Sequence, residues 1–280
     1  MQQSRFRETY LLKLRFAFAA VVIILLYRLL QGVLLSQMQQ PVLFQLPQNV
    51  YGLFNLSGIS NWLTTHYSIA LLTDILLFAL ALLSIITGNR ITVILSTLLL
   101  TVYMLVFNMA AYHAYHGLVG AIAITIPFWS QKEERFNFLW HAARYYWLYV
   151  FASAGLWKIL RASAFLNDQM SNILMQQQLD YLLQHPHSFK AGIIQYLISH
   201  PAVSHMVLLV NVGLQLSFLV GFFTRRFDTM LLVLSIVFCI ANYFVMSIVS
   251  TELLVLNLTL LNWDKIELLF ANRNAKASIA

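Results

Sequence analysis

The sequence predicts an all-α integral membrane protein, and three observations lead to this fold class. The 280 residues are 60% hydrophobic and only 10% charged, whereas soluble domains usually carry about 25% charged residues. Long apolar runs recur along the whole chain, and basic residues gather at the ends of these runs. No soluble shape of this size could cover so much apolar surface, so we expect the hydrocarbon of a bilayer to surround most of the chain.

Apolar segments long enough to cross a bilayer, or nearly so, occur along the sequence. They lie at 15–35, 67–87, 91–112, 117–130, 138–160, 202–223, 228–248 and 250–263. The fourth and the eighth are short and would cross at a tilt or only part of the way. The first follows basic residues, as in a signal peptide, but it continues without a small-residue cleavage site, so we expect an uncleaved span. The sequence therefore predicts about eight transmembrane helices, with seven, or six plus re-entrant segments, as alternatives.

The basic residues predict the orientation of the spans. They precede the first span, lie in the loops after the second, fourth and sixth spans, or follow the eighth: Arg5, Arg7, Lys13, Arg15, Arg90, Lys132, Arg135, Arg225, Arg226, Lys265, Arg273 and Lys276. With eight crossings all of them fall on one side, which the positive-inside rule assigns to the cytoplasm. We therefore expect a multi-pass protein whose N- and C-termini are both cytoplasmic. Because the basic residues lie at span ends, the net charge of +7 does not indicate a nucleic-acid partner.

The two halves of the chain follow the same predicted plan. Each half contains a span, a long outer loop, a span, a tight basic turn, another span and a short span that ends near a Trp. We predict two parallel four-helix half-repeats, at 1–136 with the outer loop 36–66 and at 137–280 with the outer loop 161–201.

Both outer loops are predicted to contain amphipathic helices. In the second loop, apolar residues recur at helical spacing, at Phe165, Met170, Ile173, Leu174, Leu179 and Leu182. Pro186 and Pro201 bracket a second short helix. Such helices would lie on the outer membrane face or cap the bundle. The bilayer is one expected partner, and the loops 36–66 and 161–201 offer surfaces for other membrane or periplasmic proteins, although an ordinary ordered connector explains them equally well.

Ionisable residues within the apolar spans are candidates for function, because a charge in hydrocarbon is costly. They are Arg28, Asp74, Arg144, Lys158 and Glu252. Asp74 could pair with Arg28 or Lys158 as a structural ion pair. Arg144 and Lys158 are fourteen residues apart, so they share one face of a helix at a separation of about 21 Å. A lysine amine in a low-dielectric pocket can act as a general base, but residues near span ends can also be simple interface anchors.

A motif rich in Tyr and His ends the third span, with Tyr112, His113 and His116. Two histidines at i and i+3 can share a metal or haem face of a helix. No carboxylate or thiol lies nearby in the sequence to complete a ligand set, so we predict no metal site. The single cysteine, Cys239, allows no disulfide within the chain.

The fifth span carries a pattern from a known family. It resembles the membrane domain of the vitamin K-dependent gamma-carboxylases and their bacterial relatives, the HTTM (horizontally transferred transmembrane) domain. Those proteins carry an Arg and, fourteen residues later, the Lys of an Ala-Gly-x-x-Lys sequence, which Arg144 and Ala154-Gly155-Leu156-Trp157-Lys158 match. The Arg15-Phe16-x-Phe18 sequence and the region around His113 also resemble the family. The resemblance covers most of the chain in layout but only these segments in motif.

The resemblance implies roles for individual residues. Lys158 would be a base acting on a quinone cofactor, such as a menaquinone or a vitamin K-like molecule in its reduced form, and His113 would support the developing oxyanion. The remaining candidates would bind substrate: Arg144, Asp74, Tyr112 and His116.

Three departures from the family pattern argue against a full glutamyl carboxylase. Family members often carry a Glu in the sixth span and a His in the seventh, where this chain has Gln215 and Asn242. The sequence also ends soon after Trp263, without a large lumenal domain. We therefore expect a short bacterial relative located in the inner membrane.

Three functions fit these observations, and whether the protein is an enzyme stays open. The first is a maturation or assembly factor that acts on a lipid-soluble or peptide substrate at the outer half of the bundle. The second is a non-catalytic subunit of a larger membrane complex, in which Lys158 would be salt-bridged. The third is a quinone- or haem-linked redox subunit, because the half-repeat resembles the four-span DoxX-like membrane proteins in architecture.

Overall fold

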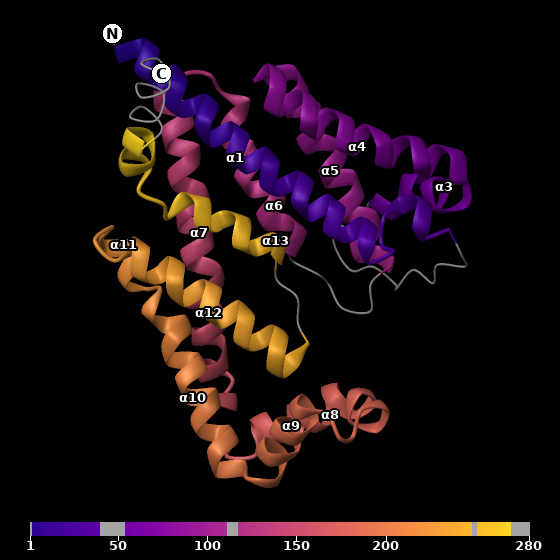
Figure 1. The fold of residues 1–280 in the computed structure, drawn as a ribbon, viewed down its shortest axis with the longest axis vertical. Coiled ribbons are helices and arrows are strands. Elements are labelled where there is room, and N and C mark those ends of the chain that lie inside the picture. The colour runs from indigo at the N-terminus through magenta and orange to yellow at the C-terminus, as the bar shows by residue number, and fades with distance from the viewer. Residues whose placement is uncertain (1, 40–53, 111–116, 248–250, 270–280) are drawn as a thin grey trace, which may run out of the picture. The chain divides into compact units, whose positions relative to one another are not determined.

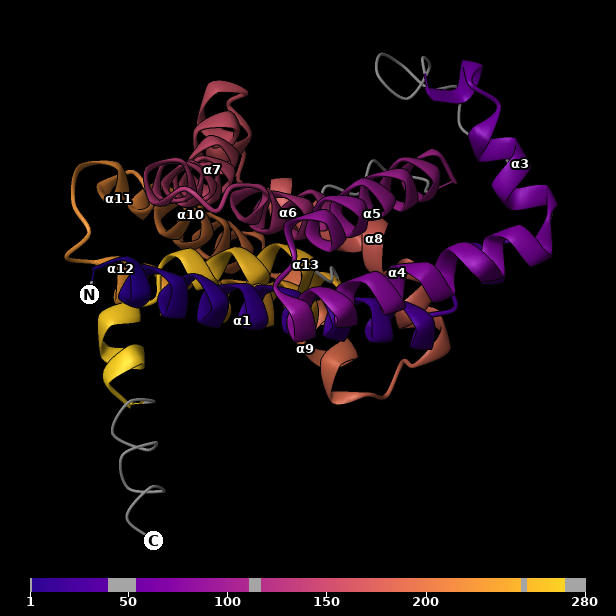
Figure 2. The same cartoon turned by 90° about the horizontal axis from the view of Figure 1, so that it is seen from above.

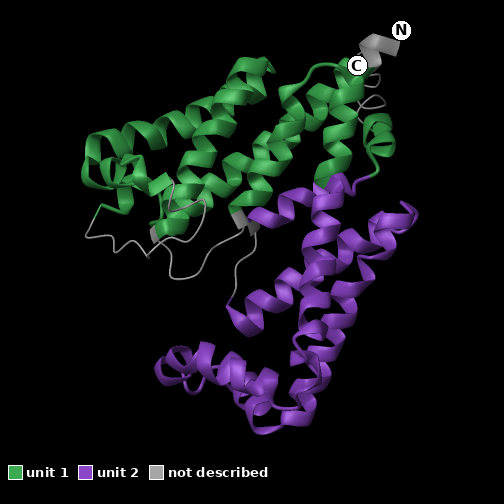
Figure 3. Ribbon diagram, turned by 180° about the vertical axis from the view of Figure 1, so that it is seen from behind, with its two compact units in different colours: residues 1–143, 262–280 green, residues 144–261 purple. Residues whose placement is uncertain are grey.

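The computed structural model describes residues 2–39, 54–110, 117–247 and 251–269. Every regular element in these residues is a helix, which confirms the predicted all-α class (Figures 1 and 2). The chain divides into two compact units, unit 1 with residues 1–143 and 262–280 and unit 2 with residues 144–261 (Figure 3). These units are defined by contacts, so they do not test the predicted sequence repeat, whose halves meet at 136/137.

Five helices of the described chain are long and apolar enough to cross a membrane. They are Phe6–Gln37, Tyr67–Thr87, Arg90–Met109, Pro201–Phe223 and Asp228–Met246. In each of these helices, between 17% and 39% of the most apolar stretch is buried inside the protein. Apolar helix surface that no protein covers requires hydrocarbon around it, so these helices are those of a membrane protein.

Three of the eight predicted spans are not among these five helices. The helix α7 (Glu133–Leu160) has 28 residues, but its charged and polar aromatic side chains make it less apolar than the five. The fourth and eighth spans correspond to α6 (Gly117–Thr125) with η2 (Ile126–Trp129) and to α13 (Thr251–Leu254) with η4 (Val255–Thr259). Nine α-helical residues, as in α6, extend only about 14 Å, half the thickness of the hydrocarbon core. The eight-crossing arrangement therefore remains a prediction.

In unit 1, α1 (Gln2–Leu30) packs on α4 (Tyr67–Thr87), and α4 packs on α5 (Arg90–Ala110) (Figure 1). The short η1 (Leu35–Gln37) and α3 (Ile59–Thr65) contact α4. The turn between α4 and α5 contains Gly88 with φ +60°, and a Cβ there would lie 2.6 Å from Cδ2 of Leu11. The left-handed backbone favours glycine here, and a Cβ at this position would also displace the side chain of Leu11 on α1.

An aromatic cluster forms part of the core of unit 1. Phe128 and Phe136 are fully buried, and Trp140 stacks on Phe136 with ring centroids 5.7 Å apart. The amine of Lys13 lies 5.2 Å from the ring centroid of Trp140 and 5.6 Å from that of Trp263. These distances are those of cation–π contacts, so Lys13 stabilises the position of Trp263 in addition to contributing to the predicted charge asymmetry.

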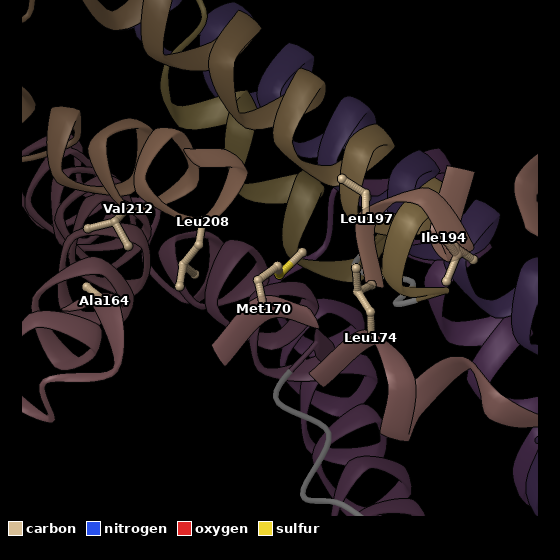
Figure 4. Close-up of a cluster of buried hydrophobic side chains, with 7 residues drawn as sticks. All are labelled: Ala164, Met170, Leu174, Ile194, Leu197, Leu208 and Val212. Atoms are coloured by element: carbon tan, nitrogen blue, oxygen red, sulfur yellow. The ribbon is translucent and has the colours of Figure 1, made fainter. Parts of the chain in front are cut away.

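In unit 2, α8 (Gln169–Gln184) and α9 (Phe189–Ser199) form a hairpin beside the start of α10 (Pro201–Ser217), and both contact α12 (Asp228–Met246) (Figure 1). Their apolar core comprises Ala164, Met170, Leu174, Ile194, Leu197, Leu208 and Val212 (Figure 4). The two helices predicted between 161 and 201 are thus present. The helical spacing placed Met170 and Leu174 correctly in the core, whereas Phe165 and Leu179 are exposed.

Candidate functional site

Lys158, near the end of α7, lies in a polar contact between α7 and α10. Its Nζ donates to Oε1 of Gln215 at 2.8 Å and to the carbonyl oxygen of Ala154 at 3.3 Å. Lys158 is half-buried and Gln215 is buried. Both acceptors are uncharged, so within the described part of the chain Lys158 is hydrogen-bonded but not salt-bridged.

Small residues before Lys158 bring α7 close to α10. A Cβ on Gly155 would lie 3.0 Å from the Cβ of Gln215, which is closer than most Cβ atoms come to a neighbour. One turn earlier, Phe151 stacks on Phe218 with ring centroids 4.1 Å apart and planes at 9°. Small residues at a helix–helix contact in a membrane allow such close packing. The Ala-Gly-x-x-Lys sequence therefore has a packing role, because it brings the following lysine within reach of α10.

A second amide lies on the same face of α10. Asn211 precedes Gln215 by four residues, about one helical turn. The buried Oδ1 of Asn211 has no hydrogen-bond partner among the residues that the structure describes. Such a buried oxygen lowers stability unless a water or a ligand donates to it. The sequence analysis did not single out Asn211; its only signal was a polar amide within an apolar span.

Arg144 connects α7 to the first residue of α12, Asp228, and to the backbone of Gly221. Its Nε and Nη2 donate to the two carboxylate oxygens of Asp228 at 3.0 and 2.5 Å, and Nη2 also donates to the carbonyl oxygen of Gly221 at 3.0 Å. Arg144 is 2% exposed. The bidentate ion pair with Asp228 neutralises the charge of Arg144 within unit 2. This favours a structural role for Arg144 over the predicted contact with substrate.

The sequence analysis did not single out Asp228, although a signal was present. Asp228 is the first residue of α12 and follows Arg225 and Arg226. Acidic side chains are stabilised at helix N-termini, and this one lies where a basic turn meets an apolar helix.

Asp74 on α4 caps the short helix η1. Its Oδ1 accepts the backbone N–H of Leu35 at 3.2 Å, and its Oδ2 accepts that of Ser36 at 2.8 Å. Asp74 is 4% exposed, so its carboxylate, and not water, accepts the hydrogen bonds of these two backbone amides. The expected pairing with Arg28 is not found in the described part of the chain; the guanidinium of Arg28 lies 4.1 Å from the ring centroid of Phe107.

We expect Asp74→Ala to lower the free energy of unfolding by about 2 kcal/mol, because two backbone amides at the start of η1 lose their acceptor. Asp74→Asn keeps one acceptor oxygen and should lose about half as much. Denaturant unfolding of the purified protein in detergent measures both changes. The matched control is Asp180→Asn on the exposed face of α8, with an expected change within about 0.5 kcal/mol. Equal stabilities of Asp74→Ala and the control would contradict the capping role.

The histidine motif lies outside the described residues. This applies to the predicted oxyanion role of His113 and to the predicted substrate contacts of Tyr112 and His116. Within the described ranges, no group of three or more His, Cys, Asp and Glu side chains could hold a metal ion. The candidate site that the structure describes is therefore the contact around Lys158.

No protein-family model, curated protein or solved structure matches this chain. The resemblance to the HTTM domain therefore rests on the three sequence segments given above, at 144–158, at 15–18 and around His113, and on the layout of the spans.

Proposed function

We propose that the protein is an HTTM-like maturation or assembly factor of a bacterial inner membrane that acts on a lipid-soluble substrate at Lys158. The observation that carries this proposal is the amine of Lys158, bonded to the neutral amide of Gln215 and to one backbone carbonyl. A neutral amine has two N–H donors and one lone pair, so these two contacts leave the lone pair for the proton of a ligand. A carboxylate partner would instead make Lys158 part of a structural ion pair.

A quinol or another phenolic compound of the menaquinone or vitamin K type suits this site chemically. The neutral amine of Lys158 can take the proton of a quinol hydroxyl, and the resulting ammonium then lies beside the anionic oxygen and stabilises it. Gln215 holds the amine in position from α10. The free Oδ1 of Asn211 could accept a second hydroxyl proton as a hydrogen bond.

The quinone content of the purified protein tests the proposal. We expect wild-type protein, purified from bacterial membranes in mild detergent, to retain quinone, and Lys158→Met to retain about tenfold less, which corresponds to the loss of one hydrogen bond to a charged group. Mass spectrometry of solvent extracts measures the amount per protein.

The control for this experiment is Lys190→Met. Lys190 also lies in unit 2, but its amine donates to Oγ of Ser247 at 2.7 Å, so the variant should keep the wild-type quinone content. Equal amounts in wild type and Lys158→Met, or quinone in neither, would exclude a quinone site at Lys158.

The contacts of the other charged residues favour a second function, that of a non-catalytic subunit of a larger membrane complex. Arg144 and Asp74 are both engaged in contacts that hold local structure together. The α8–α9 hairpin also exposes apolar side chains, among them Leu183 and Phe189, that a partner could cover. For a subunit, Lys158→Met would leave the quinone content unchanged, and cross-linking in native membranes from positions 183 and 189 would capture one defined partner.

We also propose that the two halves are a parallel repeat with both termini cytoplasmic. The long helices α1 and α7 have 29 and 28 residues, and each is followed by a 3₁₀ helix of three residues, η1 and η3 (Ser163–Phe165). Towards the end of each half, a short α-helix continues as a 3₁₀ helix. This common order of elements supports a duplication.

A further inference from the structure

A cavity of about 600 Å³ lies in unit 1. Its lining includes Phe6, Arg7 and Tyr10 of α1, Thr87 and Gly88 at the end of α4, and Gln131 in the loop before α7. Leu11 of α1 also lines the cavity and lies against the glycine turn, since a Cβ on Gly88 would be 2.6 Å from its Cδ2. The site at Lys158 uses none of these residues.

The cavity lies at the start of one candidate membrane span and at the end of another. One candidate span starts at Phe6 and the next ends at Thr87. The ends of spans lie at the level of the lipid headgroups, between hydrocarbon and water. A molecule in this cavity would therefore have its polar part among the headgroups and its apolar part beside the helices.

The lining combines a cation, an amide and aromatic rings. Arg7 is exposed at the cavity, and a guanidinium binds phosphate oxygens in pairs. The hydroxyl of Tyr10 donates to the carbonyl oxygen of Phe128 at 3.0 Å, so this ring contributes an apolar wall rather than a free donor. The hydroxyl of Thr87 is likewise engaged, with the carbonyl oxygen of Leu83 at 2.7 Å. Arg7 and the amide of Gln131 are thus the groups that remain for a polar ligand.

The electrostatic environment also favours an anion. Within the described part of the chain, none of the residues that line the cavity is acidic. Arg90 is the first residue of α5 and follows the glycine turn by two positions, which adds a second positive charge near the cavity. Basic pockets between membrane helices are typical sites for anionic lipid headgroups.

We propose that this cavity binds the phosphate headgroup of an anionic phospholipid. Arg7 contacts the phosphate, Gln131 hydrogen-bonds the headgroup, and the rings of Phe6 and Tyr10 lie beside the glycerol and the upper acyl chain. The inference does not depend on the function proposed for Lys158, since the two sites use different residues.

Lipid binding measured by native mass spectrometry in detergent tests the proposal, with phosphatidylglycerol and phosphatidylcholine as probes. We expect wild-type protein to prefer phosphatidylglycerol, and Arg7→Gln to weaken this binding about tenfold through the loss of a charge-assisted contact. The control Arg226→Gln removes the same charge from an exposed turn of unit 2 and should change the affinity less than about twofold.

Three outcomes would overturn the proposal. The first is equal weakening by Arg7→Gln and Arg226→Gln, which would reduce the effect to general surface charge. The second is equal binding of the two lipids by the wild type. The third concerns the source of the phosphate: if millimolar inorganic phosphate displaces phosphatidylglycerol in an Arg7-dependent way, the cavity is a site for a free anion.

Discussion

Arg144→Met is expected to lower the free energy of unfolding by about 3–5 kcal/mol, because it leaves the carboxylate of Asp228 without its cation. The side chains of this pair are only 3% and 14% exposed. Water therefore cannot solvate the carboxylate of Asp228 fully after the guanidinium is removed. The carbonyl oxygen of Gly221 loses its donor in the same substitution. Denaturant unfolding in detergent, followed by circular dichroism, measures the change.

A double variant separates the ion pair from simple packing. Arg144→Met with Asp228→Leu removes both charges, and replacement of a buried pair by apolar side chains is often close to neutral. We expect the double variant to recover most of the stability that Arg144→Met loses, whereas the exposed Arg226→Gln should stay within about 0.5 kcal/mol of wild type. If the double variant is as unstable as the single one, the loss comes from packing and not from the uncompensated carboxylate.

The helices of this chain could be predicted because their signal is local. Apolar runs bounded by basic residues located α4, α5 and α12 to within a few positions, and the run 202–223 covers α10 and the short α11 (Val220–Phe223). The spacing of apolar residues and two prolines also identified α8 and α9. The apolar positions predicted for the first of these two helices were only partly correct, since Phe165 precedes the helix and Leu179 is exposed. Helical spacing alone does not show which of two apolar stripes faces the core.

Contacts between distant residues could not be predicted in the same way. Arg144 and Asp228 are separated by 84 residues, and nothing in either segment indicates that they meet. Asp74 was recognised as unusual, but its partners are backbone amides that no sequence pattern identifies. The sequence therefore indicated some of the polar residues that matter, such as Asp74 and Arg144, but it missed Asn211 and Asp228, and the packing of the helices decides what each of them binds.

These contacts distinguish Lys158 from two buried polar side chains of α7, Arg144 and Trp147. Arg144 has a carboxylate of opposite charge, and the indole of Trp147 has the amide of Asn257. Lys158 has two neutral acceptors. A protein that needed Lys158 only for stability would gain more from a carboxylate at the position of Gln215, because a buried cation is stabilised best by a paired anion. This difference is why the proposed chemistry is placed at Lys158.

Asn257→Leu is expected to lower the free energy of unfolding by about 3 kcal/mol, mainly because it leaves the buried indole N–H of Trp147 without an acceptor. The Oδ1 of Asn257 accepts this N–H at 2.9 Å and lies 2.7 Å from Oγ of Ser235. Trp147 and Ser235 are both fully buried. The hydroxyl of Ser235 can still donate to the carbonyl oxygen of Leu232 at 2.7 Å. In Asn257→Leu, the indole of Trp147 is therefore the group that loses its hydrogen bond.

A mutant cycle with Trp147→Phe isolates this hydrogen bond. Trp147→Phe removes the donor, so in that background Asn257→Leu no longer leaves the indole unsatisfied, and the two substitutions should couple by about 1–3 kcal/mol. Ser235→Ala is the matched control, with an expected loss of about 1 kcal/mol or less, because Oδ1 of Asn257 keeps the indole N–H of Trp147 as a donor. Additive effects of the two substitutions in unfolding experiments would show that Asn257 stabilises unit 2 by packing alone. Coupling within this range would instead establish that the hydrogen bond between Trp147 and Asn257 connects α7 to η4 of unit 2.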